Sequence, residues 1–189
     1  MEILPFEWLT FRNPFGFISK VREVSAKLQI KPEWLMLVIW VESRFDSQAT
    51  NKSSNAFGLI QCLPSTLARL GYTLDQVKGK YGEWQLEHLV LPYLKPYVGK
   101  MNCAYDVYLA VFSPICLGKG DGYVIALEHE KAYRGNKVLD TVYGDHDGKL
   151  EVIDVKCFFK QAITKAIKLH KKDRKYASKI PLLYEPSLY

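Results

Sequence analysis

The chain has 189 residues, of which 48% are hydrophobic and 13% aromatic, and it carries a net charge of +6. This length suffices for one globular domain with a sizeable core, with or without an appendage, and the apolar content excludes a disordered chain. No apolar run approaches the roughly 18 residues of a membrane helix, so we expect no membrane span. The N-terminus lacks the basic and apolar stretches of a secretory signal, so we expect synthesis in the cytoplasm without a signal peptide.

The elements predicted for the first half of the chain are helices interrupted by one irregular segment. Apolar residues at three- and four-residue steps from Phe15 to Leu28 predict an amphipathic helix. Pro32 suits the first turn of a second helix, which is apolar almost all round as far as Val41. The segment near 43–60 is rich in Ser, Thr and Asn, and it predicts an irregular loop or a short β-ribbon.

Shorter helices are expected after this loop. One is predicted to begin at Pro64, and a second at Leu74 with Thr73 as its cap. A third is predicted over 83–98, with a bend at Pro92 and Pro96. The stretches 103–113 and about 122–133 are also predicted to be helical, and a last long helix is expected over about 152–172. The predicted fold class is therefore mainly α, and the predicted domains are 1–135, a C-terminal extension at 136–179 and an extended arm at 180–189.

The cysteines and the basic residues carry weaker signals. The four cysteines, at 62, 103, 116 and 157, lack metal or redox spacing. We predict reduced, buried thiols. Residues 156–179 hold nine Lys or Arg against one Asp, which is typical either of a surface for anionic polymers or partners or of a solvated helix face. No recognition motif accompanies this cluster, so we expect no nucleic-acid partner.

Glu42 is the most informative single residue. It follows Val38-Ile39-Trp40-Val41, a run without a hydrophilic member, near the end of the second predicted helix. Poor hydration and the negative end of the helix dipole both raise the pKa of a carboxyl group at such a place. A carboxyl group that is protonated near neutral pH can act as a general acid. The alternative is that Glu42 is only the first exposed residue after a core helix.

Two motifs around Glu42 decide between these interpretations. Glu42-Ser43-Arg44-Phe45 is followed by Ala49 and then by Gly58-Leu59-Ile60-Gln61-Cys62-Leu63-Pro64-Ser65-Thr66. This arrangement resembles the lytic transglycosylases of the goose-type lysozyme fold, whose typical motifs are Glu-Ser-x-Phe-x-Pro-x-Ala and Gly-Leu-Met-Gln-x-x-Pro-x-Thr. The resemblance covers about residues 32–133. Ser47 departs from it, because the family prefers proline there.

The resemblance implies a peptidoglycan-cleaving enzyme with Glu42 as its single general acid and base. Such an enzyme cleaves the bond from N-acetylmuramic acid to N-acetylglucosamine and leaves a 1,6-anhydro ring, without water, metal or cofactor. It further implies that Gln61 and backbone groups of Gly58, Leu59 and Ile60 line the sugar cleft and that Ser43 positions Glu42. Phe57 and Tyr72 either stack on sugars or belong to the core or wall.

The third family motif, Ala-Tyr-Asn, is absent. Val111 and Phe112 stand where Tyr and Asn are expected, and Tyr108 lies one helical turn earlier. Tyr108 is therefore either a substitute substrate-binding hydroxyl or a core residue. The stretch Leu109–Pro114 resembles a divergent branch common among phage and phage-derived enzymes, which implies action on the bacterial cell wall, with a virion component as one form of delivery.

Three alternative functions remain open at this point. A hydrolytic muramidase of the same fold would need a second carboxylate to activate water, and Asp46, Asp75, Asp106 and Asp121 are the candidates. A glycan-binding module would keep the fold without the reaction. A structural virion or secretion component would make its contacts through residues 180–189 and the basic helix.

Residues 143–154 match a degenerate calcium loop. Asp145, Asp147, Glu151 and Asp154 occupy positions three, five, nine and twelve of an EF-hand pattern, with Gly148 at position six. Tyr143 replaces the usual carboxylate at position one, and Asp154 is shorter than the usual Glu. We expect the loop to keep the turn, and any calcium bound there to be structural.

Overall fold

The structure is a computed structural model that describes residues 4–13 and 16–171. The described residues form two compact units, one ending at Val107 and the other beginning at Tyr108. The boundary predicted near residue 135 lies inside the second unit. The predicted arm at 180–189 and the basic residues from 172 to 179 lie outside the described residues, so their predicted roles stay predictions.

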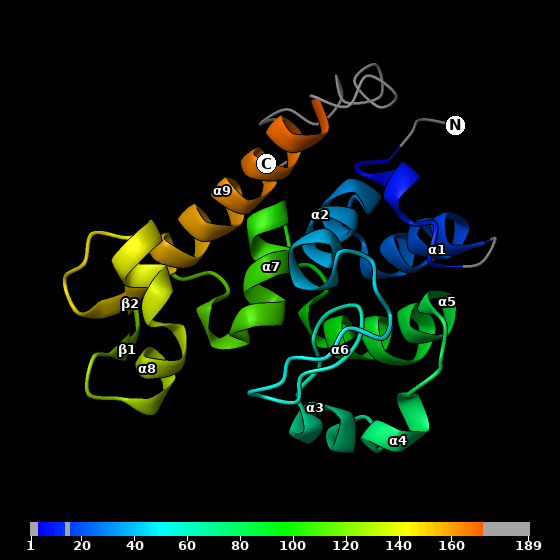
Figure 1. Ribbon diagram of the computed structural model, residues 1–189, viewed down its shortest axis with the longest axis horizontal. Coiled ribbons are helices and arrows are strands. Elements are labelled where there is room, and N and C mark those ends of the chain that lie inside the picture. Colours follow the sequence, from blue (N-terminus) through cyan, green and yellow to red (C-terminus); the bar gives the residue numbers. More distant parts are fainter. Residues whose placement is uncertain (1–3, 14–15, 172–189) are drawn as a thin grey trace. The chain divides into compact units, whose positions relative to one another are not determined.

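The first unit is built around two helices joined by a short link. After the 3-10 turn η1 (Glu7–Leu9), α1 (Phe17–Leu28) and α2 (Pro32–Ser43) follow each other and pack together (Figure 1). α1 buries Phe17, Val21, Val24 and Leu28 on one face, as its amphipathic pattern predicts. α2 is buried from Trp34 to Trp40 without a break, so it is the central helix of this unit.

Short helices complete the first unit. They are α3 (Pro64–Arg69), α4 (Leu74–Val77), α5 (Gly82–Gln85), the π-helical segment η2 (Leu86–Val90), α6 (Leu91–Leu94) and the 3-10 turn η3 (Lys95–Tyr97). Thr73 begins α4 with a capping box to Gln76, as predicted. In place of the single helix predicted over 83–98, the chain forms the four consecutive segments α5, η2, α6 and η3. α6 and η3 each have one of the two prolines in their first turn.

The segment near 43–60 contains no regular strand in the described structure. It is held by isolated bridges from Thr50 to Phe57 and from Phe57 to Cys62. The backbone amides and carbonyls of Phe57 and Cys62 bond to each other at 3.0 and 2.9 Å, which closes a tight turn over the intervening residues. The irregular form of this segment agrees with the prediction.

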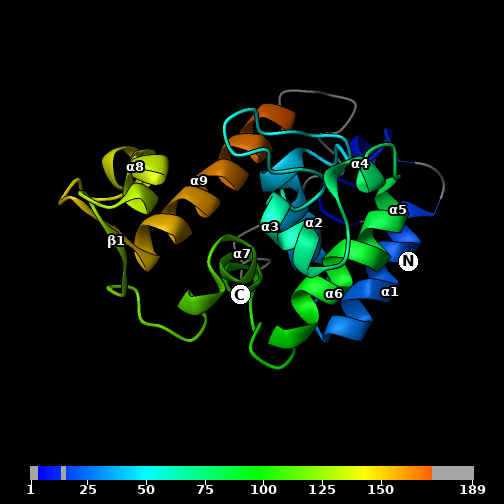
Figure 2. The same ribbon diagram turned by 90° about the horizontal axis from the view of Figure 1, so that it is seen from below.

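The second unit contains the long C-terminal helix and the regular sheet of the described structure. α7 (Ala104–Phe112) crosses the boundary between the units and is followed by the 3-10 turn η4 (Pro114–Cys116). Then come β1 (Val124–Leu127), α8 (Lys131–Val138), the π-helical segment η5 (Leu139–Tyr143), β2 (Lys149–Glu151) and α9 (Val152–Lys171). The two strands are antiparallel, with Ala126 opposite Leu150, and α8 lies close to them (Figures 1 and 2).

The helix predicted over about 122–133 is wrong except for its last three residues. Residues 124–127 form β1, and the helix begins only at Lys131. Val124 and Ile125 are β-branched and follow Gly120 and Gly122, a combination that favours a strand after a turn. Pairing with β2 provides hydrogen-bond partners for the backbone of this segment. The local sequence pattern did not indicate that β2 would be the partner.

In the second unit, an acidic residue shortly after each strand accepts a hydrogen bond from the amide of the last residue of that strand. Glu130 accepts a hydrogen bond from the Leu127 amide at 2.7 Å, and Asp154 accepts one from the Glu151 amide at 2.8 Å. In both cases the acid lies three residues after the donor and beside the start of a helix, where a negative charge is favourable. The strand and the following helix are therefore joined in the same way twice.

Two further features of the described residues concern the helices and the cysteines. No helix among them has both the length and the apolar character required to cross a bilayer. The four cysteines are free. The predicted burial is correct for Cys62 and Cys116 and wrong for Cys103 and Cys157, which are partly exposed.

Candidate active site

Glu42 lies in the last turn of the buried helix α2, where the chain turns sharply away from the core. Arg44 and Phe45 follow it with φ of 54° and 61°, in the left-handed region, and this conformation ends the helix. The Phe45 ring is fully buried, and its centroid lies 5.7 Å from that of Trp40. The core thus fixes both sides of the turn and holds Glu42 at the margin between interior and surface.

Burial raises the pKa of Glu42 to about 7, and the positive charge of Arg44 opposes this rise. The Arg44 guanidinium is directed back to the helix end, where it donates to the carbonyls of Trp40 and Val41 and lies 4.6 Å from the Trp40 ring centre. The helix carbonyls thus engage Arg44. A carboxyl group with a pKa raised to about 7 is available in both its protonated and its ionised form near neutral pH.

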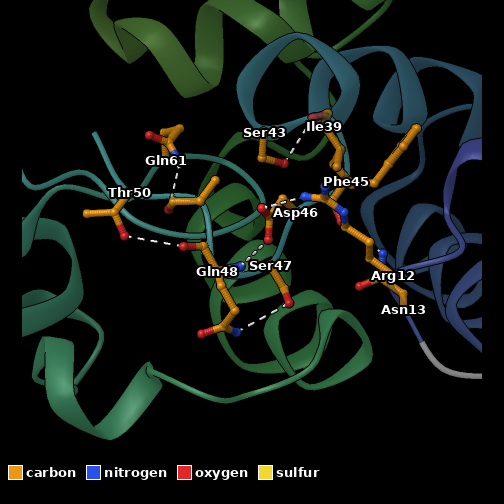
Figure 3. A network of polar contacts seen from close by, with 11 residues as sticks. Arg12, Asn13, Ile39, Ser43, Phe45, Asp46, Ser47, Gln48, Thr50 and Gln61 are labelled. Atoms are coloured by element: carbon orange, nitrogen blue, oxygen red, sulfur yellow. Dashed lines mark hydrogen bonds and ion pairs between the residues drawn. The ribbon is translucent and has the colours of Figure 1, made fainter. Parts of the chain in front are cut away.

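Ser43 joins the end of α2 to the second motif. Its hydroxyl is buried and lies 3.2 Å from the Ile39 carbonyl (Figure 3). It also lies 3.0 Å from the Leu59 carbonyl, so it can donate to either. A serine directly after Glu42 therefore ties the loop of the second motif to the helix that carries the acid. In the structure its side chain faces the loop backbone.

Gln85 is a buried residue of the site that the sequence did not indicate. It lies at the end of α5 and is 1% exposed. Its Oε1 accepts from the Leu59 amide at 3.0 Å, and its Nε2 donates to the Ser47 carbonyl at 2.6 Å. A Cβ at Gly58, where φ is +81°, would lie 2.3 Å from the same Oε1. One glutamine thus joins both motif loops, and the glycine makes room for it.

Gln61 holds the tight turn from inside. It has a φ of 49°, and its Nε2 donates to the carbonyls of Ala49 at 3.2 Å and Gly58 at 3.0 Å. Figure 3 shows its side chain directed to this backbone. These bonds fix the amide of Gln61 in the loop that Ser43 attaches to α2 and Gln85 attaches to α5.

The apolar side chains of the second motif belong to the core. Phe57, Leu59 and Ile60 are 2%, 1% and 4% exposed. Phe57 therefore occupies a wall position in the structure rather than an exposed stacking position, and any contact of Leu59 or Ile60 with a sugar would have to come from the backbone. Tyr72 is half-buried, and its ring packs edge-on against Trp84.

Tyr108 lies in the second unit and is 4% exposed. Its ring stacks on Phe159 of α9, with centroids 4.5 Å apart and planes inclined by 17°. Phe112 and Phe158 are further aromatic neighbours. This surrounding is that of a core residue, which was one of the two interpretations of Tyr108.

The candidate second carboxylates of a hydrolase all have partners. Asp46 forms an ion pair with Arg12 at 2.8 Å and accepts from the Gln48 amide, as Figure 3 shows. Asp75 pairs with Lys78, Asp121 pairs with Lys156, and Asp106 accepts from the Asn102 amide. Among the described residues, no carboxylate contributes to the raised pKa of Glu42, although a nearby like charge would raise it further.

The predicted calcium loop brings together a different set of acids from the one expected. Carboxylate oxygens of Asp140, Asp145 and Asp147 lie within 4.8 Å of one another. The buried Asp140 accepts from the Tyr133 hydroxyl at 2.6 Å and from the Gly148 amide at 3.1 Å. Asp140 precedes the loop by one helical turn, so the motif pattern missed it.

The other predicted ligands of this loop have different surroundings. Asp154 is 3% exposed, and burial is the main cause that raises its pKa. The hydrogen bond from the Glu151 amide lowers this pKa, and the negative charges of Asp140 and Asp145 raise it. Glu151 is half-buried at the end of β2. Lys149 forms an ion pair with Asp147 at 2.5 Å. Calcium binding therefore stays a prediction of the sequence.

Comparison with known proteins agrees with the motif region. Residues 19–86 match the family described as the transglycosylase SLT domain. This range contains most of α1, all of α2, the loop of the second motif and α3 to α5, and so both motifs around Glu42. The match supports glycan cleavage of the lytic transglycosylase type, with peptidoglycan as substrate. No curated protein matches the chain. The family match therefore covers about a third of the chain, and it supports a relation of residues 19–86 to the lytic transglycosylases.

Proposed function

We propose that the protein cleaves peptidoglycan strands by the lytic transglycosylase reaction, with Glu42 as its single general acid and base. The observation that carries the proposal is the raised pKa of Glu42, about 7, at the end of a buried helix inside the matched domain. A carboxyl group with this pKa can both give and take a proton near neutral pH.

The proposed reaction has two proton transfers. Protonated Glu42 donates to the oxygen that links N-acetylmuramic acid to N-acetylglucosamine, and the bond from muramyl C1 to that oxygen breaks. The Glu42 carboxylate then takes the proton from the muramyl C6 hydroxyl, whose oxygen bonds to C1 and closes the 1,6-anhydro ring. Glu42 ends protonated, so neither water nor a cofactor is consumed.

The surroundings of Glu42 support one carboxylate rather than two. A hydrolase needs a second carboxylate for the attacking water, and the four sequence candidates are engaged by cations or backbone amides. We further propose that Gln61 and the backbone of Gly58 to Ile60 contact the sugars. Ser43 would hold that loop in place through its hydroxyl group. Tyr108 would contribute to the packing of the second unit rather than contact the sugars.

The test compares Glu42→Gln with wild type on purified sacculi, followed by loss of turbidity. We expect the rate to fall by about a factor of 10²–10⁴, the range for loss of a general acid. Glu33→Gln is the matched control, because Glu33 lies in the first turn of the same helix. Its rate should stay close to that of wild type.

Mass spectrometry of the released fragments separates the two reactions of this fold. Anhydro-muropeptides are expected, whereas reducing ends would identify a hydrolase. Retention of wild-type activity by Glu42→Gln would remove Glu42 from its proposed role. Binding to sacculi without any fragment release from wild type would favour a glycan-binding module.

A further inference from the structure

Arg44 is bonded to the end of α2 both by its backbone and by its side chain. Its backbone amide donates to the Trp40 carbonyl at 3.1 Å, and its guanidinium donates to the same carbonyl. The guanidinium also donates to the Val41 carbonyl at 3.2 Å. That carbonyl belongs to the peptide bond that joins Val41 to Glu42. The side chain therefore turns back over the last turn of the helix, beside the residue that carries the acid.

Two aromatic rings hold the guanidinium in this position. Its carbon atom lies 4.6 Å from the centre of the Trp40 ring, a distance at which a cation is attracted by the π-electrons of the ring. The Trp40 ring packs in turn on the fully buried Phe6, with centroids 4.7 Å apart and planes inclined by 28°. Phe6 lies in the segment before α1, so a part of the chain distant in sequence fixes the ring on which Arg44 lies. Arg44 itself is exposed, and its substitution should leave the core intact.

The charge of Glu42 acts on groups from three parts of the first unit. These are Arg44 at the end of α2, Cys62 in the second motif and Tyr93 in α6. Burial is the main cause that raises the pKa of the Cys62 thiol and of the Tyr93 hydroxyl to about 12, so both are neutral where Glu42 titrates. Arg44 is the charged member of the three. Its charge lowers the pKa of Glu42 against the larger effect of burial.

The bonds and the charge of Arg44 act on Glu42 in the same direction. The carbonyls at the end of a helix carry partial negative charge, which disfavours an ionised carboxyl group, and a cation bonded to them reduces this effect. The positive charge also favours the carboxylate directly. We infer that Arg44, held on the Trp40 ring, is a positioning residue that keeps the end of α2 in place and helps Glu42 to release its proton. The inference rests on the proposed function and deepens it, because the first step of that reaction needs this proton.

The experiment measures kcat and kcat/KM on purified glycan strands from about pH 4 to about pH 9, at constant ionic strength. Arg44→Met removes the charge and keeps a long unbranched side chain. We expect the alkaline fall of kcat/KM, which reports the ionisation of Glu42 in the free enzyme, to move to higher pH by about half a unit to one unit. The value of kcat below this fall should decrease by about threefold to tenfold, because the acid is weaker. Arg44→Lys should recover most of both changes, since it keeps the charge.

Lys31→Met is the matched control. Lys31 is also an exposed cation near an aromatic ring, 5.2 Å from Trp34. It precedes α2 at the end opposite to Glu42, roughly 16 Å away along the helix. This variant should leave kcat and the pH profile unchanged.

A pH profile of Arg44→Met that coincides with that of wild type would overturn the inference, whether or not the rate falls, because a merely structural loss lowers the rate without moving the profile. If wild type cleaves no glycan, the proposed function fails. NMR titration of isotope-labelled glutamate carboxyl groups, with Glu42 identified by its absence in Glu42→Gln, then still tests Arg44 without substrate. A higher midpoint for Glu42 in Arg44→Met supports the effect on its proton, and an equal midpoint in the two proteins overturns it.

Discussion

At the scale of single residues, Glu42 shows how burial changes the chemistry of a carboxyl group. The last turn of α2 leaves it little water, and its pKa rises to about 7. The sequence indicated this, because the four preceding residues are apolar. The opposing charge of Arg44 is weaker than the effect of burial, since the net shift is upward.

The raised pKa makes the free energy of unfolding depend on pH. The folded state favours protonated Glu42, so its stabilising effect is complete below the ordinary value of 4.5 and is lost as the pH rises through about 7. Above pH 7 the buried charge should cost about 1–3 kcal/mol. We therefore expect Glu42→Gln to be more stable than wild type at about pH 8 and to differ less from it at about pH 4.

Urea unfolding of both proteins at the two pH values measures this difference. Glu33→Gln serves again as the control, and it should not change the pH dependence. A stability gap between Glu42→Gln and wild type that is independent of pH would mean that the carboxyl group is well solvated in the folded protein.

At the scale of elements, the site depends on how loops are joined to helices. Gln85 contacts the backbone of two loops that are far apart in sequence, and Gly58 leaves space for its side chain. The glycine of the second motif was evident in the sequence as a motif residue. Its partner was not, because Gln85 belongs to no motif and reaches the loop only through the fold.

Alanine substitutions at Gly58 and Gly71 distinguish the cost of a strained backbone from the cost of a steric clash. Gly58 and Gly71 have φ of +81° and +86°, but only at Gly58 would a Cβ meet another atom within 4 Å. Gly71→Ala should cost only about 1 kcal/mol for the left-handed conformation. Gly58→Ala should cost at least about 2 kcal/mol more, since it displaces the buried Gln85 amide and leaves polar groups unpaired.

Denaturant unfolding of the two variants gives this comparison. Gly58→Ala should also slow cleavage of sacculi, because the second motif would shift, while Gly71→Ala should remain active. Equal destabilisation of the two variants would show that Gln85 does not hold the loop as described.

The acidic loop before α9 is a second element whose prediction can be checked. If calcium binds at Asp145 and Asp147 with the buried Asp140, about 1 mM calcium should raise the melting temperature relative to EDTA by a few degrees. Magnesium should do so less, since it prefers a smaller, stricter octahedral site. Calorimetry of wild type and Asp145→Asn tests this, and identical melting with calcium and EDTA would refute calcium binding.

At the scale of the whole molecule, the net charge predicts how binding to the cell wall depends on salt. The chain carries a net charge of +6, which favours anionic polymers at long range. Binding of Glu42→Gln to sacculi should therefore weaken as NaCl rises from about 0.05 to 0.5 M, where screening shortens the range of charges. Co-sedimentation measures this binding. Retention independent of salt would mean that sugar contacts alone hold the protein on the wall.

The sequence by itself determined the mainly helical fold class, the buried helix with its terminal acid and the resemblance of the two motifs around Glu42 to the lytic transglycosylases. Each of these follows from signals that are local along the chain: apolar periodicity, helix caps and two motifs of fixed spacing. Only the tertiary structure decided that 124–127 is a strand and that Gln85 holds the second motif. These depend on contacts between segments that are distant in sequence, and a strand partner or a buried amide leaves no periodic trace in its own segment.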